Sequence, residues 1–469
     1  MAARTGSSMG NLHPYRITII APTCFYYQAP LFRALAADSR IDLTVYFCTD
    51  EGISGKDTKA AYGTDESWAP KDDLMEGYRS KFLRNHAPWG SYLRSLVGLA
   101  NLGIWKELRR NCPDAVVVMS WMNPTWWLTY LACLKLGIPM LFMTDANVHA
   151  EVLKSPWKSW LKRVALGKLL FPAISGFLCA GTSNRELYVS YGVPDEKLFP
   201  FAYSWGYGSL IENSKCLRSQ KSALRTEYGL PQDAVVLLYC GRLSAEKGSI
   251  ELMNAYKMVS QPEKALVVVG DGKLRKPMQE LADAQDLDSI YFMGFQNRDN
   301  IGKFYALADI LVLPSREETW GMVVNEGLCF SLPVIVSDQV GSGADLVIPE
   351  ENGYVFPSSD VGALAEGMSK LIELPDEDRV KMGEQSQRLI TEWSNRDLPA
   401  AIVKYFGSMG LGRPQQSARL SLRRLALRVY RSLPDLVAFA VALIFVGTIW
   451  MAGIIFLALR LVLDRFKDA

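Results

Sequence analysis

Residues 315–338 read SREETWGMVVNEGLCFSLPVIVSD, and the arrangement of this stretch indicates the fold. The apolar run ADILVLP that leads into it and the run LPVIVSD at its end have the length and composition of short buried strands. Strand, loop, helix and strand in this order form a βαβ unit of a parallel sheet. Glu318 falls in the predicted loop and Glu326 in the predicted helix. Both carboxylates are therefore expected at the edge where the strands end, which is where such sheets bind ligands.

Length and composition restrict the class of protein. A chain of 469 residues is long enough for two domains with extensions. Its hydrophobic content of 49% and charged content of 21% are typical of a globular protein, and a net charge of +2 argues against nucleic acid as a partner. The eight cysteines are scattered without a CxxC pair and the three histidines lie far apart. Neither a disulfide framework nor a metal site is expected.

Strand-like runs alternate with helical stretches along most of the chain, first from RITII at 16–20 and again from AVVLLYC at 234–240. Two series of this kind predict an α/β protein with two Rossmann-like domains, each built on a doubly wound parallel sheet. Neither series has GxGxxG after its first strand, and GxxxxGK[ST] is absent. Dinucleotide and P-loop sites therefore lack their glycine loops.

Two basic side chains follow the first strand of the second series. In CGRLSAEKG, Arg242 and Lys247 are spaced across a short, glycine-bounded loop and can direct two positive charges at one anion. The backbone amides of Gly321, Met322 and Val323 start the predicted helix of the opening stretch and also favour an anion. A diphosphate would bridge the two elements.

The two glutamates suit the two ends of a larger ligand. Carboxylates are good acceptors for vicinal hydroxyl groups. Glu326 would bind the ribose of a nucleotide, and Glu318 would bind the hydroxyls of a group beyond the phosphates. The predicted ligand is a nucleoside diphosphate sugar.

Residues 235–357 resemble the donor domain of the retaining GT-B glycosyltransferases of family 4, also called glycosyl transferases group 1. The motifs that carry the resemblance occur in the family's order: Gly241-Arg242-Leu243 with Glu246-Lys247-Gly248, Gly270-Asp271-Gly272, Pro314-Ser315 with Glu318, Gly321 and Glu326, Ser331-Leu332-Pro333-Val334, and Asn352-Gly353-Tyr354-Val355-Phe356-Pro357. The resemblance implies two domains facing a cleft, transfer with retained configuration, and no metal or cofactor. By the same resemblance Arg242 and Lys247 contact the diphosphate, Glu326 the ribose and Glu318 the sugar.

Further donor contacts are implied for Gly241, Gly270 and Asp271 by their places in these motifs. Arg298, in GFQNRDN, either contacts the nucleotide base or caps a loop. The predicted segments of the chain are a disordered tail at 1–14, an acceptor domain at 15–203, a donor domain at 204–392, a helix crossing back to the first domain at 393–412, a basic amphipathic segment at 413–434 and a transmembrane helix at 435–463.

The first half departs from the family pattern. The loop after its first strand reads APTCFYYQAPLFRAL and lacks the paired glycines that many relatives carry there. Where many relatives place a histidine, this chain has Thr144-Asp145-Ala146-Asn147, and Asp145 either faces the acceptor and the reacting sugar or caps a helix. Trp121, Trp126 and Trp127 either line the acceptor site or, as is more common, belong to the core or to a membrane-facing patch.

The C-terminal part of the chain contains a long apolar segment that differs in composition from the two predicted domains. Residues 436–459 carry no charge, and at about 1.5 Å per residue they are long enough to cross a bilayer. Five arginines at 419, 423, 424, 428 and 431 precede them without an acidic residue, which predicts that the large N-terminal part is cytoplasmic. The arginine-rich stretch is interpreted as an interfacial helix on anionic lipid, or as a helix that packs on the soluble domain.

The sequence thus predicts a hexosyltransferase-type enzyme that moves a sugar from a nucleotide sugar to a lipid-linked or membrane-surface acceptor. UDP is the expected nucleotide of the donor. The alternatives are a nucleotide-sugar epimerase of the same fold and an inactive membrane scaffold.

Overall fold

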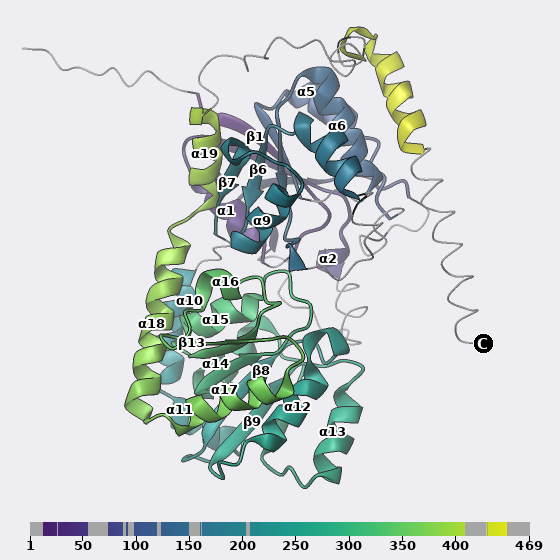
Figure 1. Ribbon diagram of the computed structural model, residues 1–469. Coiled ribbons are helices and arrows are strands. Elements are labelled where there is room, and N and C mark those ends of the chain that lie inside the picture. The colour runs from purple at the N-terminus through teal and green to yellow at the C-terminus, as the bar shows by residue number, and fades with distance from the viewer. Residues whose placement is uncertain are drawn as a thin grey trace, which may run out of the picture.

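The computed structural model shows two parallel-sheet domains, one above the other (Figure 1). It describes residues 13–25, 27–54, 74–87, 91, 98–119, 123–149, 160, 162–202, 207–408, 428 and 430–447. The predicted α/β class with two Rossmann-like domains is confirmed. Most of the predicted N-terminal tail lies outside the described residues.

The described part of the first domain has a seven-stranded sheet of order β3-β2-β1-β4-β5-β6-β7, in which all neighbouring strands are parallel. Its strands are β1 (Tyr15–Ala21), β2 (Ile41–Phe47), β3 (Arg79–Phe82), β4 (Ala115–Val118), β5 (Met140–Met143), β6 (Gly176–Cys179) and β7 (Leu198–Pro200). Side chains from both faces of the central strands are buried: Ile19 lies in one core cluster and Ile20 in another. Burial on both faces explains why these strands are continuous apolar runs rather than alternating ones.

Helices cover both faces of this sheet. They are α1 (Ala29–Ala37), α2 (Glu51–Ser54), α5 (Ile104–Asn111), α6 (Pro124–Leu136) and α9 (Thr182–Ser190), with a π-helical segment at Arg163–Leu170 and 3-10 turns at Phe171–Ala173 and Asp195–Lys197. Local sequence sets the ends of α6. The side chain of Asn123 accepts a hydrogen bond from the amide of Trp126, Pro124 opens the first turn, and Gly137 ends the helix with a left-handed φ of 70°.

The second domain has a six-stranded parallel sheet of order β10-β9-β8-β11-β12-β13 among its described residues. Its strands are β8 (Val235–Cys240), β9 (Lys264–Val269), β10 (Ile290–Gly294), β11 (Ile310–Leu313), β12 (Val334–Ser337) and β13 (Gly353–Phe356). Its helices are α10 (Tyr207–Arg218), α11 (Lys221–Glu227), α12 (Ser249–Met258), α13 (Arg275–Ala284), α14 (Arg298–Leu307), α15 (Met322–Cys329), α16 (Gly343–Leu346), α17 (Val361–Glu373) and α18 (Asp376–Ser394), with a 3-10 turn at Ala245–Lys247. The strand order reverses between β8 and β11, and this is the point where open sheets of this kind bind ligands.

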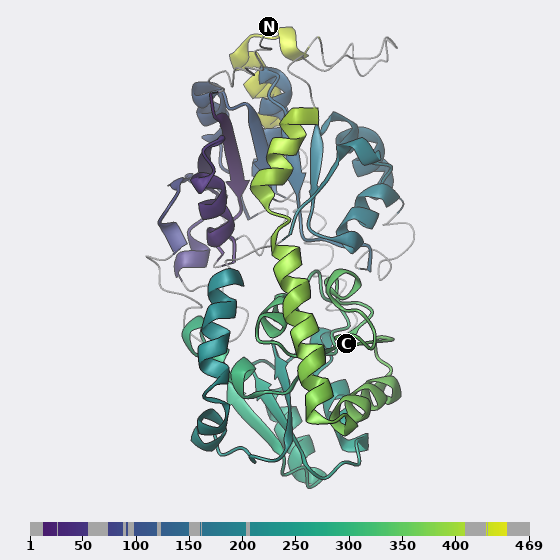
Figure 2. The same cartoon turned by 90° about the vertical axis from the view of Figure 1, so that its left-hand side faces the viewer.

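The chain returns to the first domain at its end. α18 runs along the second domain, and α19 (Leu398–Ser408) continues along the first (Figure 2). The ring of Phe406 stacks on Tyr15 of β1 with a centroid distance of 4.0 Å. Where the sequence predicted one crossing helix at 393–412, the structure has the end of α18, a short break and α19. The return helix ties the two domains together.

The C-terminal apolar segment is helical at 435–447, and its remaining residues lie outside the described part. No helix among the described residues is long and apolar enough to span a bilayer. One face of this stretch packs on the first domain, where Ala438, Ala442 and Val446 are buried in its core cluster. Tyr430 and Leu433, from the predicted amphipathic segment, pack on the same cluster. The structure shows that the described part of the amphipathic segment packs on the folded domain. The rest of that segment, 413–427 with 429, lies outside the described residues.

Candidate functional site

The loops after β8 and β11 bring the predicted charged residues together. Lys247 Nζ lies 2.7 Å from Oε2 of Glu318, although 71 residues separate them. Gly248 makes this approach possible. Its φ of +67° is left-handed, and a Cβ atom there would lie 2.1 Å from the carbonyl oxygen of Pro314. The glycine of the GRLSAEKG loop is therefore required for the two loops to touch.

Arg242 lies in the same loop and forms an ion pair of 2.8 Å with Glu246. Both side chains are partly exposed, so the guanidinium retains faces open to solvent. Gly270 has a φ of +135°, and a Cβ atom at this position would lie 1.9 Å from the carbonyl oxygen of Gly241. The carboxylate of Asp271 accepts bonds from Arg275 at 2.6 Å and from the amide of Gly272 at 2.7 Å. The Gly270-Asp271 pair thus supports the Arg242 loop, and the contacts of Asp271 are with the protein.

A cavity of about 500 Å³ lies over these residues and reaches the first domain. Its lining is predominantly polar and consists of Asn147, His149, Arg242, Glu246, Lys247, Arg316, Glu317, Glu318, Thr319 and Gln339. Two residues come from the loop after β5 and the others from the second domain. Residues of both domains can therefore contact a ligand in this cavity.

The loop after β5 carries Asp145 and Asn147. The Nδ2 group of Asn147 donates to the carbonyl oxygens of Glu318 and Thr319, at 3.0 and 3.1 Å. Thr319 Oγ1 lies 3.5 Å from Oδ2 of Asp145. Desolvation by the surrounding protein raises the pKa of the Asp145 carboxyl, and the nearby Glu318 carboxylate adds to this effect. The structure thus puts Asp145 at the cleft, close to Glu318.

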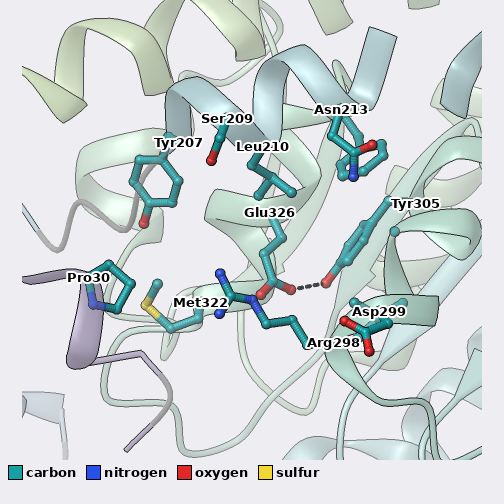
Figure 3. A pocket seen from close by; sticks show the side chains of 13 residues that line it. Pro30, Tyr207, Ser209, Leu210, Asn213, Arg298, Asp299, Tyr305, Met322 and Glu326 are labelled. Carbon is teal, nitrogen blue, oxygen red and sulfur yellow. Dashed lines mark hydrogen bonds between the residues drawn. The ribbon is translucent and has the colours of Figure 1, made fainter. Parts of the chain in front are cut away.

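Glu326 lies in a second cavity, of about 430 Å³. This cavity is formed mainly by α10, α14 and α15, and its lining is Pro30, Tyr207, Ser209, Leu210, Asn213, Arg298, Asp299, Ile301, Gly302, Tyr305, Met322, Glu326 and Phe330. Figure 3 shows the Glu326 carboxyl between the phenol of Tyr305 and the guanidinium of Arg298. Tyr305 donates a hydrogen bond of 2.5 Å to Oε2 of Glu326.

Burial raises the pKa of Glu326, whereas the Tyr305 hydrogen bond and the Arg298 charge act in the opposite direction. Gly321, with a φ of 89°, is the residue before α15, and Met322 and Val323 are its first two residues. The start of α15 therefore stands between Glu318 in the loop before it and Glu326 on its second turn. The backbone amides of Met322 and Val323, in the first turn of α15, can bind an anion between the two cavities.

Two residues of the site, Tyr305 and Asn147, were not identified from the sequence, which also left the roles of the three tryptophans open. Nothing in KFYALAD marks Tyr305 as a partner of Glu326, and no sequence signal assigns a role to Asn147. Trp126 is buried and stacks on Tyr130, while Trp127 packs edge-on against Trp126, so both belong to the packing of α6. Trp121 lies outside the described residues. Among those residues, no group of three histidine, cysteine, aspartate or glutamate side chains is placed to hold a metal ion.

Comparison with known proteins identifies the second domain. Residues 220–389 match the family model of glycosyl transferases group 1. This domain is a group 1 glycosyltransferase domain. The resemblance found in its motifs is thereby confirmed at the level of the group.

Characterised relatives of the glycosyltransferase domain act on different sugars. The chain is 26% identical to alpha-D-kanosaminyltransferase of Streptomyces kanamyceticus over 55% of this chain and 68% of that protein. It is 30% identical to lipopolysaccharide 1,2-N-acetylglucosaminetransferase of Salmonella typhimurium over 40% of this chain and 53% of the relative. Sulfoquinovosyl transferase of Arabidopsis thaliana is 32% identical over 31% of this chain and 28% of its own length. Two of these three matches thus span about half or less of the relative.

Solved structures share the fold of both domains. Anabaena HepE in complex with UDP and glucose superposes with a TM-score of 0.60 at 16% identity, over 84% of this chain and 99% of HepE. A glycosyltransferase from Rickettsia africae superposes with a TM-score of 0.64 at 13% identity, over 85% of this chain and 100% of its own. The described chain therefore has the GT-B fold.

Proposed function

We propose that the protein is a retaining family 4 glycosyltransferase that moves a hexose-type sugar from a nucleoside diphosphate to a membrane-associated acceptor. The observation that carries the proposal is the meeting of Lys247, Glu318 and Arg242 at one cavity beside the start of α15. Two cations and free helix amides suit a diphosphate, and a carboxylate beside them suits sugar hydroxyls. The motif residues Gly241, Gly270 and Asp271 shape this site.

The nucleoside is assigned to the second cavity. There Glu326 accepts the ribose hydroxyls, and Arg298 and the residues of α10 surround the base. We assign uridine as the base, and the UDP and glucose bound by Anabaena HepE support this choice. The assignment makes α15 a divider, with the nucleoside on one side of its first turn and the sugar on the other.

The reaction breaks the bond between the anomeric carbon and the diphosphate oxygen. The acceptor hydroxyl adds to the same face of the anomeric carbon, and its proton passes to the departing diphosphate. Arg242, Lys247 and the amides of Met322 and Val323 stabilise the negative charge of the leaving group, which is the largest contribution expected from the protein. Asp145, at the cleft, orients the acceptor or the sugar by hydrogen bonding. Neither a metal ion nor a cofactor has a part in the proposed scheme.

The acceptor is assigned to a membrane, with the catalytic domains on its cytoplasmic face and the C-terminal apolar segment as the membrane anchor. The uncharged residues 436–459 and the arginines that precede them support this assignment. A membrane acceptor gives the apolar segment a role beyond its packing on the first domain. An epimerase of the same fold would have little need of a membrane segment.

The test is a thermal-shift panel of UDP, GDP, ADP and their sugars, followed by turnover with membrane extract. A ligand that binds only the folded state raises the melting temperature according to its saturation. We expect UDP and one UDP-sugar to stabilise the protein, Arg242→Ala to abolish the shift, and labelled sugar to appear in the lipid fraction. Epimerised nucleotide sugar without transfer would favour the epimerase, and binding without turnover would favour the scaffold.

A further inference from the structure

The helical stretch at 435–447 lies along the first domain beside α5 and α6 (Figure 1, yellow). Ala438, Ala442 and Val446 are spaced four residues apart, so they share one face, and all three are buried. Small residues on this face let the helix approach α5 and α6 closely. The ring of Phe439 lies 5.3 Å from Trp105 of α5, and that of Phe445 lies 6.0 Å from Trp127 of α6.

A polar contact fixes the beginning of this helix. Lys135, in the last turn of α6, donates to the carbonyl oxygens of Arg431 at 2.7 Å and Leu433 at 2.6 Å. Arg431 in turn donates from Nε to the carbonyl oxygen of Leu134 at 2.9 Å. Asp435 lies 3.6 Å from Lys135 Nζ and 3.2 Å from a guanidinium nitrogen of Arg109. Only 10% of the Lys135 side chain is exposed, so the contact is largely shielded from water.

The contacts define the direction of the helix. Its first residue meets Lys135 at the end of α6, and Phe445 meets Trp127 near the start of α6. The helix therefore runs antiparallel to α6. Because α6 follows β4, its start lies at the edge of the sheet where the strands end, which is the cleft edge. The later part of the 435–447 helix consequently points toward the cleft side of the first domain.

The opposite face of the helix is apolar and exposed. Its large outward side chains are between 43% and 79% exposed: Leu436, Val437, Val441 and Ile444. Phe445, at the border of this face, is 46% exposed and also contacts Trp127. The sequence from 436 to 447, LVAFAVALIFVG, contains no polar side chain. A continuous exposed apolar surface is unusual on a soluble protein and indicates an interaction site.

Lipid is the occupant that the chemistry favours. The apolar sequence continues beyond the described helix through residues 448–459, and five arginines without an acidic residue precede it at 419–431. Apolar side chains next to a cationic segment match an acyl region beneath anionic headgroups. A protein partner would be expected to offer polar contacts at the rim, and the outward side of this helix has no polar group to meet them.

We propose that the 435–447 helix is a fixed part of the first domain and that its outward face lies in lipid. The bilayer then meets the protein along α5 and α6, and the anchor holds the cleft edge of the acceptor domain in one orientation toward the membrane. A lipid-linked acceptor would enter the cleft from this side. Entry of the acceptor from this side rests on the proposed function, whereas the lipid contact and the fixed docking of the helix do not.

The lipid contact is tested with nitroxide labels on the full-length protein in vesicles of mixed neutral and anionic lipid. The exposed Cys112 and Cys216 are first replaced by serine, and single cysteines are placed at Leu436, at Ile444 or, as a control, at the exposed Met258 of α12. We expect labels at 436 and 444 to collide with oxygen and to be protected from a water-soluble nickel chelate, and the label at 258 to show the reverse. Labels at 436 and 444 that are open to the chelate would overturn the proposal, as would labels hidden from both reagents, which would indicate a protein cover.

The docking is tested by breaking the Lys135 contact. Lys135→Ala and Asp435→Asn should each increase the mobility of the label at 444, while Lys276→Ala on the exposed surface of α13 should not. The melting temperature and its rise with UDP report folding and donor binding separately, so a failed proposed function is distinguished from a failed docking proposal. Equal label mobility in the Lys135→Ala and Lys276→Ala proteins would show that the helix is not held by this contact and would overturn the proposal.

Discussion

UDP affinity is expected to fall at acidic pH, and Tyr305→Phe should move this fall, the acid limb of the binding profile, to higher pH. The phenol of Tyr305 is buried and donates a hydrogen bond of 2.5 Å to Glu326. This bond stabilises the carboxylate against the burial that raises the pKa of Glu326. Phenylalanine retains the ring that stacks on Phe330 with a centroid distance of 5.4 Å, and it removes only the donor.

The size of the effect follows from the charge of the acceptor. A hydrogen bond to an ionised group contributes about 1.5–3 kcal/mol, and 1.36 kcal/mol changes an equilibrium about tenfold. Removing the phenol should therefore favour protonation of Glu326 by about ten- to a hundredfold. Since the carboxylate is the form that accepts both ribose hydroxyls, UDP affinity is present above the pKa of Glu326 and is lost as the pH falls through it.

Isothermal calorimetry of UDP binding over a series of pH values from neutral to acidic measures this limb. In the wild-type protein we expect it above the ordinary glutamate value of about 4.3, because the pKa of Glu326 is raised. Glu326→Gln should bind UDP more weakly and without the limb, and Tyr305→Phe should add no further pH dependence in that background. The reasoning fails if Tyr305→Phe leaves the limb at its wild-type pH, or if Glu326→Gln retains it.

Three further outcomes are expected. Asn147→Ala removes two hydrogen bonds to the Glu318 loop and should lower transfer to membrane extract by about 5- to 150-fold, with UDP affinity nearly unchanged. The control is Thr182→Val, which removes another hydrogen bond between the domains. A loss of transfer no larger than that of the control would contradict a specific role for Asn147. Glu318→Ala should lower transfer but not UDP affinity in calorimetry, whereas Glu326→Ala should lower both, and equal losses of UDP affinity would refute this division. Transfer should survive a strong chelator while Arg242→Ala lowers it about a hundredfold or more; inactivation by the chelator that magnesium or manganese reverses would refute metal independence.

The fold was predictable because local signals and tertiary demands agree. Strands buried on both faces must be continuous apolar runs, and such runs are visible in the sequence around Ile19 and Leu237. The meeting of Lys247 with Glu318 followed from motif order, because loops at the same edge of one sheet lie side by side. Asn147 could not be found in this way. It lies 171 residues from Glu318 in the other domain, and no local pattern encodes how two domains close on each other.

The C-terminal segment shows the opposite case, in which a strong local signal leaves the tertiary answer open. Hydropathy measures how unfavourable it is to expose the side chains of a segment to water. Burial in lipid and burial against a protein surface both remove this exposure. The apolar run from 436 therefore predicts a membrane helix whether or not one face is covered by protein. The small residues Ala438 and Ala442 were the available sign of a packed face. Lys135 on α6, which fixes the start of the helix, could not be identified from the sequence of the segment itself.

The ion pair of Lys247 with Glu318 links phosphate binding to sugar binding. Lys247 pairs with Glu318 at 2.7 Å and Arg242 pairs with Glu246 at 2.8 Å, so the protein's own carboxylates compete for cations that the proposed diphosphate requires. The Arg242–Glu246 pair is partly exposed and contributes little stability, so a diphosphate can displace it at small cost. The side chains of Lys247 and Glu318 are only 19% and 17% exposed, so breaking their pair costs more and requires the diphosphate to replace the Glu318 charge beside Lys247. When Lys247 turns to the phosphates, the Glu318 carboxylate loses its partner and becomes available to hydroxyl groups. UDP alone would leave that carboxylate unpaired in the cleft, whereas a sugar on the diphosphate would satisfy it. The Lys247–Glu318 ion pair thus favours the complete donor over its product.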